Sequence, residues 1–190
     1  FVGHKPLKEV LTLVYLTDVE LAKLKLHVFK QQRLNMVKMM FLFSVYTGLA
    51  YNEATELKEG NILTDNDGDE WINIIRKKTT KTVSIFLLKE ARALLDYFRK
   101  TNTGSEYVLP RLSNQKFNSY LKEIADIVGI NKRLTHHIAR KTFATTILLN
   151  NNIPIETVSS LLGHGNTKIT QKYYAEVLNR KIKKDLKAAF

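Results

Sequence analysis

The stretch from residue 61 to 87 differs from the rest of the chain, because its side chains alternate as in β-strands rather than repeating with a helical period. Residues 71–76 (WINIIR) alternate between two faces, and residues 83–87 (VSIFL) follow a polar break. The acidic run at 65–68 has its glycine at the fourth position, not the sixth, and no closing glutamate follows, which favours a solvated turn over an EF-hand calcium loop. We therefore expect a small antiparallel sheet with a hairpin at residues 77–81.

The remaining segments carry helix signals. Thr17 and Glu20 have the spacing of a capping box, Gly48 and Gly129 stand where helices would end, and Pro154 suits a first helical turn. Helices are predicted at about 17–28, 33–47, 52–57 (capped by Asn52), 89–101, 113–128, 135–149, 154–163 and 167–174, with a basic amphipathic tail at 177–190. The expected class is mainly α with a small antiparallel β-sheet (α+β). We expect one domain over 1–190, with 1–16 as a leading segment.

The charge of the chain is strongly positive. Thirty Lys and Arg against eighteen Asp and Glu give a net charge of +12 and a pI near 9.8. Such a surplus attracts polyanions, so double-stranded DNA or another nucleic acid is the first candidate partner and an anionic membrane surface the second. No apolar run approaches the ~20 residues that span a bilayer. The absence of cysteine excludes disulfides and suits a cytoplasmic, DNA-associated protein.

Four stretches together resemble the tyrosine recombinase, or phage integrase, family: TGLAYNEATELKEGNI (47–62), IRKKTTKTVSIFL (75–87), LTHHIARKTFATTILL (134–149) and LLGHGNTKITQKYYAEV (161–177). An HxxR pair alone would carry no weight, but HxxR followed by TFAT, LLGH and a tyrosine nine residues later is a specific combination. The resemblance covers 40–180. It implies the catalytic-domain fold of that family and site-specific DNA recombination, the integration or excision of a mobile element through a 3′-phosphotyrosyl intermediate.

His137 and Arg140 are three residues apart on a predicted helix, so they share one face. Arginine offers a planar fork of donors for phosphate oxygens, and histidine exchanges a proton near neutral pH. A basic surface helix that touches the DNA backbone is the alternative interpretation. With the resemblance, both residues are expected to hold the scissile phosphate. Arg133 before this helix and Lys141 within it are expected to contact the DNA backbone.

The resemblance also assigns roles outside this helix. Lys78 in the hairpin would be the general acid that protonates the leaving 5′ oxygen; its neighbours Lys77 and Lys81 would contact phosphates, with Lys77 as the fallback acid. His164 would bind the scissile phosphate and support the nucleophile. By counting from His164, Tyr173 is that nucleophile. The adjacent Tyr174 is the alternative, and a core or DNA-stacking tyrosine is the structural interpretation of whichever one does not react.

The first box departs from the family pattern. The family reads TGLR there, whereas this chain has Ala50 in place of the arginine, although Glu53 matches the acidic position. Some integrases of mobile elements similarly lack this arginine. Arg76, just before Lys78, is our first candidate for its substitute. The alternative is a catalytically impaired DNA-binding relative that acts as a regulator, because losing such a contact costs about 10²–10³ in rate.

Several expectations about the whole protein follow from the resemblance. Four protomers would assemble on two DNA sites, and the chain alone would be a monomer that needs neither cofactor nor metal. No nucleotide-binding loop or zinc helix is present in the sequence. The chain begins with Phe1, and the family usually carries a separate helical DNA-binding domain upstream, so we expect a piece of a longer protein. Rival interpretations are a type IB topoisomerase and a basic helix-turn-helix regulator built on 135–163.

Overall fold

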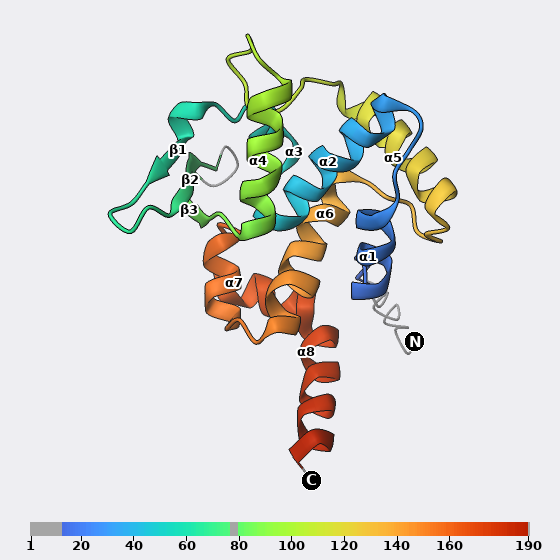
Figure 1. The fold of residues 1–190 in the computed structure, drawn as a ribbon. Coiled ribbons are helices and arrows are strands. Elements are labelled where there is room, and N and C mark those ends of the chain that lie inside the picture. The colour runs from blue at the N-terminus through green and yellow to red at the C-terminus, as the bar shows by residue number, and fades with distance from the viewer. Residues whose placement is uncertain (1–12, 77–79, 190) are drawn as a thin grey trace, which may run out of the picture.

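The structure, a computed structural model, describes residues 13–76 and 80–189, without the side chains of six residues in the last helix: Tyr173, Glu176, Arg180, Lys184, Ala188 and Ala189. It is mainly helical with one small sheet (Figure 1). In chain order the elements are α1 Asp18–Leu26, α2 Gln32–Thr47, α3 Tyr51–Thr55, the 3₁₀ turn η1 Glu59–Asn61, β1 Ile62–Thr64, β2 Glu70–Ile75, β3 Thr82–Phe86, α4 Lys89–Thr101, α5 Asn114–Val128, α6 His136–Thr142, η2 Phe143–Leu148, η3 Leu149–Asn151, α7 Ile155–Leu161 and α8 Thr167–Ala189.

Helix α2 forms the centre of the fold. Its residues are buried on nearly every side from Met40 to Thr47, and it packs against α4, α5 and α6. Gly48 ends the helix with φ +66°, as the sequence predicts, since glycine adopts this left-handed conformation without a side-chain clash. A second apolar cluster, around η2, α7 and α8, includes Phe143 and Tyr174. The packing thus places α6 between the two clusters.

The sheet is antiparallel in the order β1-β2-β3, with Ile72 of β2 opposite Ile62 on one side and Ile85 on the other. The predicted strands are confirmed and β1 is an addition. The acidic turn is also confirmed, because the Gly68 amide donates to the Asp65 carbonyl at 3.1 Å. The hairpin between β2 and β3 includes residues 77–79, which lie outside the described part.

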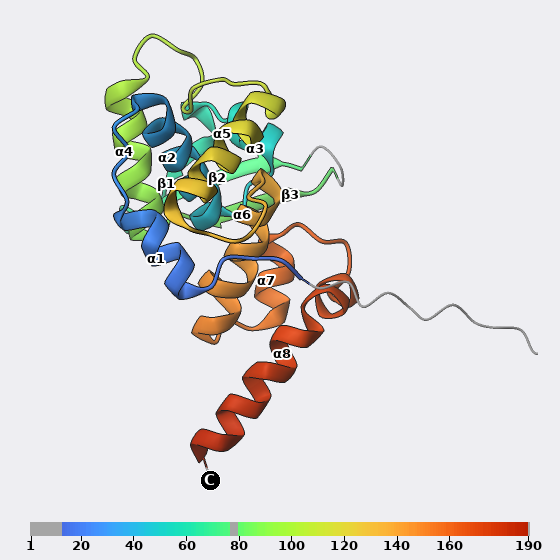
Figure 2. The same cartoon turned by 90° about the vertical axis from the view of Figure 1, so that its right-hand side faces the viewer.

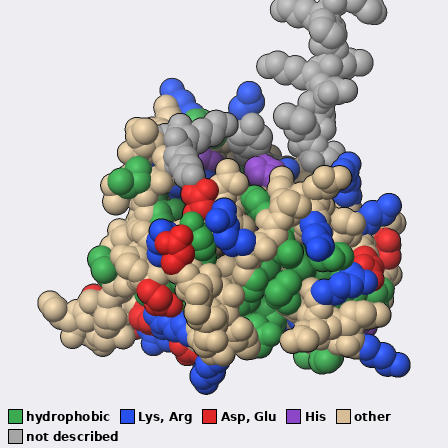
Figure 3. All heavy atoms as spheres, turned by 90° about the horizontal axis from the view of Figure 1, so that it is seen from above, with side chains coloured by type: hydrophobic (Ala, Val, Ile, Leu, Met, Phe, Trp, Pro, Cys, Tyr) green, Lys and Arg blue, Asp and Glu red, His purple; other side chains and the backbone are tan. Residues whose placement is uncertain are grey.

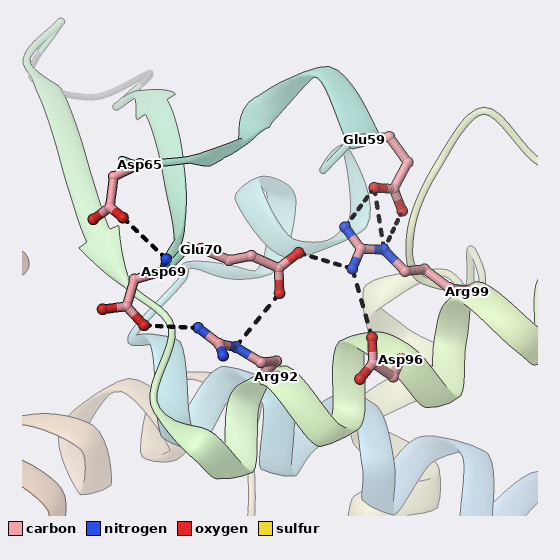
Figure 4. Close-up of polar contacts among 7 residues, drawn as sticks. All are labelled: Glu59, Asp65, Asp69, Glu70, Arg92, Asp96 and Arg99. Atoms are coloured by element: carbon pink, nitrogen blue, oxygen red, sulfur yellow. Dashed lines mark hydrogen bonds and ion pairs between the residues drawn. The ribbon is translucent and has the colours of Figure 1, made fainter. Parts of the chain in front are cut away.

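Two arginines of α4 tie that helix to the sheet (Figure 4). Arg99 bonds to Glu59 and Glu70, and Arg92 pairs with Asp69 at 3.1 Å. These side chains are partly exposed, so each pair adds little by itself, but Glu70 lies within reach of both arginines. The network fixes the sheet, and with it the start of the hairpin, against the helical body.

Three predicted helix boundaries are wrong. The short helix is capped by Ala50, not Asn52, because the Glu53 carboxylate accepts the Ala50 amide at 2.7 Å. The helix predicted at 135–149 leaves α-geometry after Thr142 and continues as the π-helical η2. The helix at 167–174 and the tail form one helix, α8, since no glycine or proline interrupts it.

Among its described side chains, helix α8 contacts the body as far as Lys181. Val177 is buried and the Lys181 ammonium donates to the Leu149 carbonyl at 3.1 Å, whereas Ile182 and Leu186 are exposed. Both ribbon views show the C-terminal half extending away from the other elements (Figures 1 and 2). Among the described helices none is long and apolar enough to cross a membrane.

Candidate active site

Arg140 on α6 is held by the backbone of two distant segments. Its Nη1 donates to the Gly48 carbonyl at 2.5 Å, and its Nη2 donates to the carbonyl of Leu162 at the end of α7. Burial, together with the nearby positive charge of Arg76, lowers the pKa of Arg140 to about 10. The guanidinium therefore stays charged at neutral pH in a half-buried site, where a cation stabilises a phosphate more strongly than it does in bulk water.

Arg76, directly after β2, approaches the same helix end from the sheet. Its Nη2 donates to the Leu161 carbonyl at 2.8 Å, and its Nη1 forms an ion pair with Glu53. The residue is 3% exposed, and burial lowers its pKa, which Glu53 partly opposes. Two guanidinium groups thus bond to consecutive carbonyls, and the Arg76 Nε atom is buried without a partner among the described residues.

His164 follows the helix end that the two arginines hold. Its Nδ1 lies 2.7 Å from the Thr170 hydroxyl on α8, and its pKa is lowered by partial burial and by Arg140 and Arg76. A groove of about 460 Å³ runs past this ring between β3 and α7, with the exposed Lys81 on its other side. The imidazole is therefore neutral at physiological pH, and it faces a groove that the Lys81 side chain also lines.

His137 lies beside Arg140 on the opposite side, in a smaller pocket of about 210 Å³ that Ala50 also lines. Partial burial and the charges of Lys141 and Arg140 lower the pKa of His137. The pocket includes the space next to Arg140 that a longer side chain at position 50 would enter. The preceding residue, His136, also lines this pocket but is buried, and its Nε2 lies 2.8 Å from the Ser44 hydroxyl.

The two candidate tyrosines lie on α8. Tyr174 is 4% exposed within the apolar cluster around η2, and burial raises the pKa of its phenol to about 12. A buried phenol with a raised pKa is a poor nucleophile. The side chain of Tyr173 lies outside the described residues, although its backbone is helical. Tyr174 thus has the structural role, which leaves Tyr173 as the candidate nucleophile.

The predicted DNA-contacting residues are only partly described. Lys81 and Arg133 are exposed, and Lys141 is half-buried near His137. Lys77 and Lys78 lie outside the described residues. Figure 3 shows one end of the molecule, with basic side chains spread widely over it and histidine side chains near its upper edge. The exposed cations and the histidines are thus accessible to a polyanion.

Taken together, the buried Arg76 and the half-buried Arg140 bond to the end of α7, His164 directly follows it, and His137 lies on the far side of Arg140. This set suits a phosphodiester, because the arginines neutralise its charge and a neutral imidazole either accepts or donates one proton. No group of three acidic, histidine or cysteine side chains able to hold a metal occurs among the described residues. Sequence reasoning missed Thr170 and the three backbone carbonyls, since no motif marks them.

Comparison with known proteins gives consistent matches. Residues 15–180 match the phage integrase family. Tyrosine recombinase XerD of Listeria innocua is 36% identical over 139 residues, which are 67% of this chain and 46% of that protein. Transposase B of transposon Tn554 from Staphylococcus aureus is 28% identical over 153 residues, 73% of this chain and 24% of that protein. The chain therefore spans half the length of these relatives or less.

Solved structures show the same fold. The crystal structure of XerA recombinase superposes with a TM-score of 0.71 at 22% identity, covering 96% of this chain and 66% of that one. The XerH site-specific recombinase bound to its difH substrate, before cleavage, gives a TM-score of 0.66 at 21% identity over 84% of this chain and 50% of that one. The mainly α fold with a small sheet is thus confirmed.

Proposed function

The chain belongs to the phage integrase family, and we propose that it is the catalytic domain of a site-specific recombinase that cuts and rejoins duplex DNA through Tyr173. The observation that carries the proposal is the convergence of Arg76 and Arg140 on the end of α7, directly before His164. The relatives include a tyrosine recombinase and a transposase, which supports integration or excision of a mobile element as the biological role.

In the proposed cleavage step, the Tyr173 phenol loses its proton to water as its oxygen attacks the scissile phosphorus, and the bond to the 5′ oxygen breaks. The products are a 3′-phosphotyrosyl link and a free 5′ hydroxyl. Arg140 neutralises the charge on the phosphorane-like transition state, which is the main source of acceleration in such a site. His137 and His164 bind the same phosphate, and Lys78 donates a proton to the leaving oxygen. Attack by a 5′ hydroxyl of a partner duplex reverses the step and exchanges strands.

Arg76 takes the role of the arginine that Ala50 replaces in this proposal. Its guanidinium is buried, and its charge is close enough to contribute, after burial, to the lowered pKa of Arg140. Glu53, three residues after Ala50, forms the ion pair with Arg76 while its carboxylate also accepts the Ala50 amide. The positive charge missing from the first box is thus supplied from the end of β2.

The wider assembly is also proposed. Residues 1–190 form one catalytic domain, with 1–16 as its leading segment and 177–190 as its tail; four copies act on two DNA sites, and a single copy is a monomer without DNA. Lys77, Lys81, Arg133 and Lys141 contact the DNA backbone. The reaction needs no cofactor, since the energy of the phosphodiester is kept in the tyrosyl bond.

Covalent trapping tests the function. The natural polypeptide that carries this chain is incubated with sheared DNA of the organism that encodes it; protein-linked fragments are isolated and sequenced, and the enriched site is built into a nicked suicide duplex. We expect an adduct on a denaturing gel that is lost in Tyr173→Phe and kept in Tyr174→Phe. Specific binding without an adduct would instead support the alternative, a regulator built on the same fold.

A further inference from the structure

The contact between His164 and Thr170 lies outside every role assigned above. The Thr170 hydroxyl is 2.7 Å from Nδ1 of the ring, and the Thr170 side chain is completely buried, with 0% exposure. Thr170 lies in the first turn of α8, three residues before Tyr173. Among the described residues, Nε2 of His164 has no hydrogen-bond partner, and the ring lines the groove beside Lys81.

The Thr170 hydroxyl is used differently from the other buried threonine hydroxyls. All of those donate to backbone carbonyls: Thr47, Thr55, Thr142 and Thr145 to the carbonyl four residues earlier, and Thr146 to the carbonyl of Leu16. The residue four before Thr170 is Asn166, whose carbonyl accepts the Ile169 amide at 3.1 Å. The Thr170 side chain bonds to the histidine ring instead, so its hydroxyl proton is available to Nδ1.

The direction of this hydrogen bond is linked to which ring nitrogen carries the proton: if the hydroxyl donates to Nδ1, the N–H of the neutral ring is on Nε2. A neutral imidazole has one N–H, and the hydrogen bond made at one nitrogen selects the tautomer at the other. Three cationic side chains surround His164, Arg140 from α6, Arg76 from the end of β2 and Lys81 from the loop before β3, and one carboxylate, Glu156, lines the groove from α7. Partial burial, together with the charges of Arg140 and Arg76, lowers the pKa of the ring and keeps it neutral, so the tautomer matters.

We propose that Thr170 is a positioning residue: by donating to Nδ1 of His164, it holds the proton on Nε2 and aims that N–H at the scissile phosphate. The inference rests on the proposed function. It also links the histidine to the helix that carries the candidate nucleophile, because one hydrogen bond fixes His164 relative to α8. His164 is then oriented towards the phosphate only when α8 is packed against the body of the domain.

Three variants test the inference. Thr170→Val keeps the shape and removes the hydroxyl, Thr170→Ser keeps the hydroxyl, and Thr145→Val is the matched control, because Thr145 is equally buried but bonds only to backbone. On the nicked duplex carrying the enriched site, at saturating DNA, we expect adduct formation roughly 10-fold slower in Thr170→Val. Thr170→Ser and Thr145→Val keep the unaltered rate, and the affinity for uncleaved DNA is the same in all.

Nitrogen NMR of the DNA-free protein gives a readout that a purely structural role would not move. We expect the Nε2–H tautomer of His164 in the unaltered protein and in Thr170→Ser, and a mixture of tautomers in Thr170→Val. A Thr170→Val protein that cleaves at the unaltered rate would overturn the inference, and so would a Thr170→Ser protein as slow as Thr170→Val.

If Thr170→Val does not fold, two results still test the inference: the rate of Thr170→Ser and the tautomer of His164 in the unaltered protein. An Nδ1–H tautomer in the unaltered protein would overturn the inference. The proposed function fails in a distinguishable way. No adduct from the unaltered protein refutes recombination and, with it, the catalytic part of the inference. Normal adduct formation together with a threonine-independent rate refutes the inference alone.

Discussion

Glu53 and Arg76 form an ion pair inside the protein, with side chains that are 10% and 4% exposed. Removing one member of such a pair leaves the other as an uncompensated buried charge. We expect Glu53→Gln to lower the free energy of unfolding by about 3–5 kcal/mol, measured from urea denaturation. The matched control is Glu123→Gln at the surface pair with Arg33, whose side chains are 37% and 42% exposed and whose loss is expected to cost much less. Equal losses of stability in the two variants would contradict the expectation that the buried pair costs more to break than the surface pair.

Arg76 is expected to be needed for cleavage as well as for stability. Arg76→Met removes a cation beside Arg140 and is expected to slow adduct formation by about 10²–10³. Adding Ala50→Arg returns a guanidinium from the first box into the adjacent pocket, and we expect this double variant to recover part of the rate. The measurement is the single-turnover rate on the suicide duplex, with Arg33→Met as a surface-arginine control. An Arg76→Met protein that cleaves normally would remove Arg76 from the proposed site.

The sequence was sufficient for features that depend on local interactions. Thr17 and Glu20 form the predicted capping box, and Gly48 and Gly129 end their helices in the left-handed conformation. The alternation in residues 71–76 gave the strand. These signals worked because each depends on side chains only a few positions apart, where spacing alone decides which atoms meet.

The arrangement of the site depended on packing that spacing does not encode. Arg140 bonds to backbone carbonyls 92 and 22 residues away, at Gly48 and Leu162, and any residue type supplies a carbonyl. The π-helical segment after Thr142 was missed for the same reason, since η2 packs with Phe143 in the second apolar cluster, which distant parts of the chain complete. Resemblance placed Arg140 and His164 in one site, whereas the Thr170 contact required coordinates.

Gly48 is expected to tolerate no side chain, because two separate effects oppose it. An added Cβ would lie 2.3 Å from Cδ1 of Phe143, and the residue has φ +66°. We expect Gly48→Ala to lose about 1–2 kcal/mol from backbone strain and about 1–3 kcal/mol more from the clash. Gly129→Ala separates the effects, since φ there is +72° but nothing lies within 4 Å of the added carbon.

Thermal unfolding of the two glycine variants, each alone and Gly48→Ala together with Phe143→Leu, measures the difference. The smaller leucine side chain is expected to restore part of the stability lost to the clash and none of the stability lost to backbone strain. If Gly48→Ala and Gly129→Ala lose the same stability, Phe143 moves aside at no cost, and the ring does not fix the backbone that accepts the Arg140 hydrogen bond.

His136 is expected to make stability depend on pH. Burial lowers its pKa from 6.5 to about 4, with the charges of His137 and Arg140 adding to the effect. Between these two pH values the unfolded chain binds a proton at this residue and the folded chain does not, so stability falls as the pH drops from 6.5 towards 4 and levels off below it. His136→Gln keeps a polar group near the Ser44 hydroxyl, and it is expected to reduce the slope of unfolding free energy against pH by up to about 1.4 kcal/mol per pH unit.

Urea denaturation at several pH values measures the slope, with His27→Gln as the control for losing a more exposed histidine. The pKa values of His137 and His164 are also lowered, so both residues contribute to the pH dependence of stability. The test is therefore the difference in slope between the variant and the unaltered protein, not the total slope. An unchanged slope in His136→Gln would mean that His136 binds its proton equally well in the folded and unfolded chains. Burial next to Ser44 would then not lower its pKa.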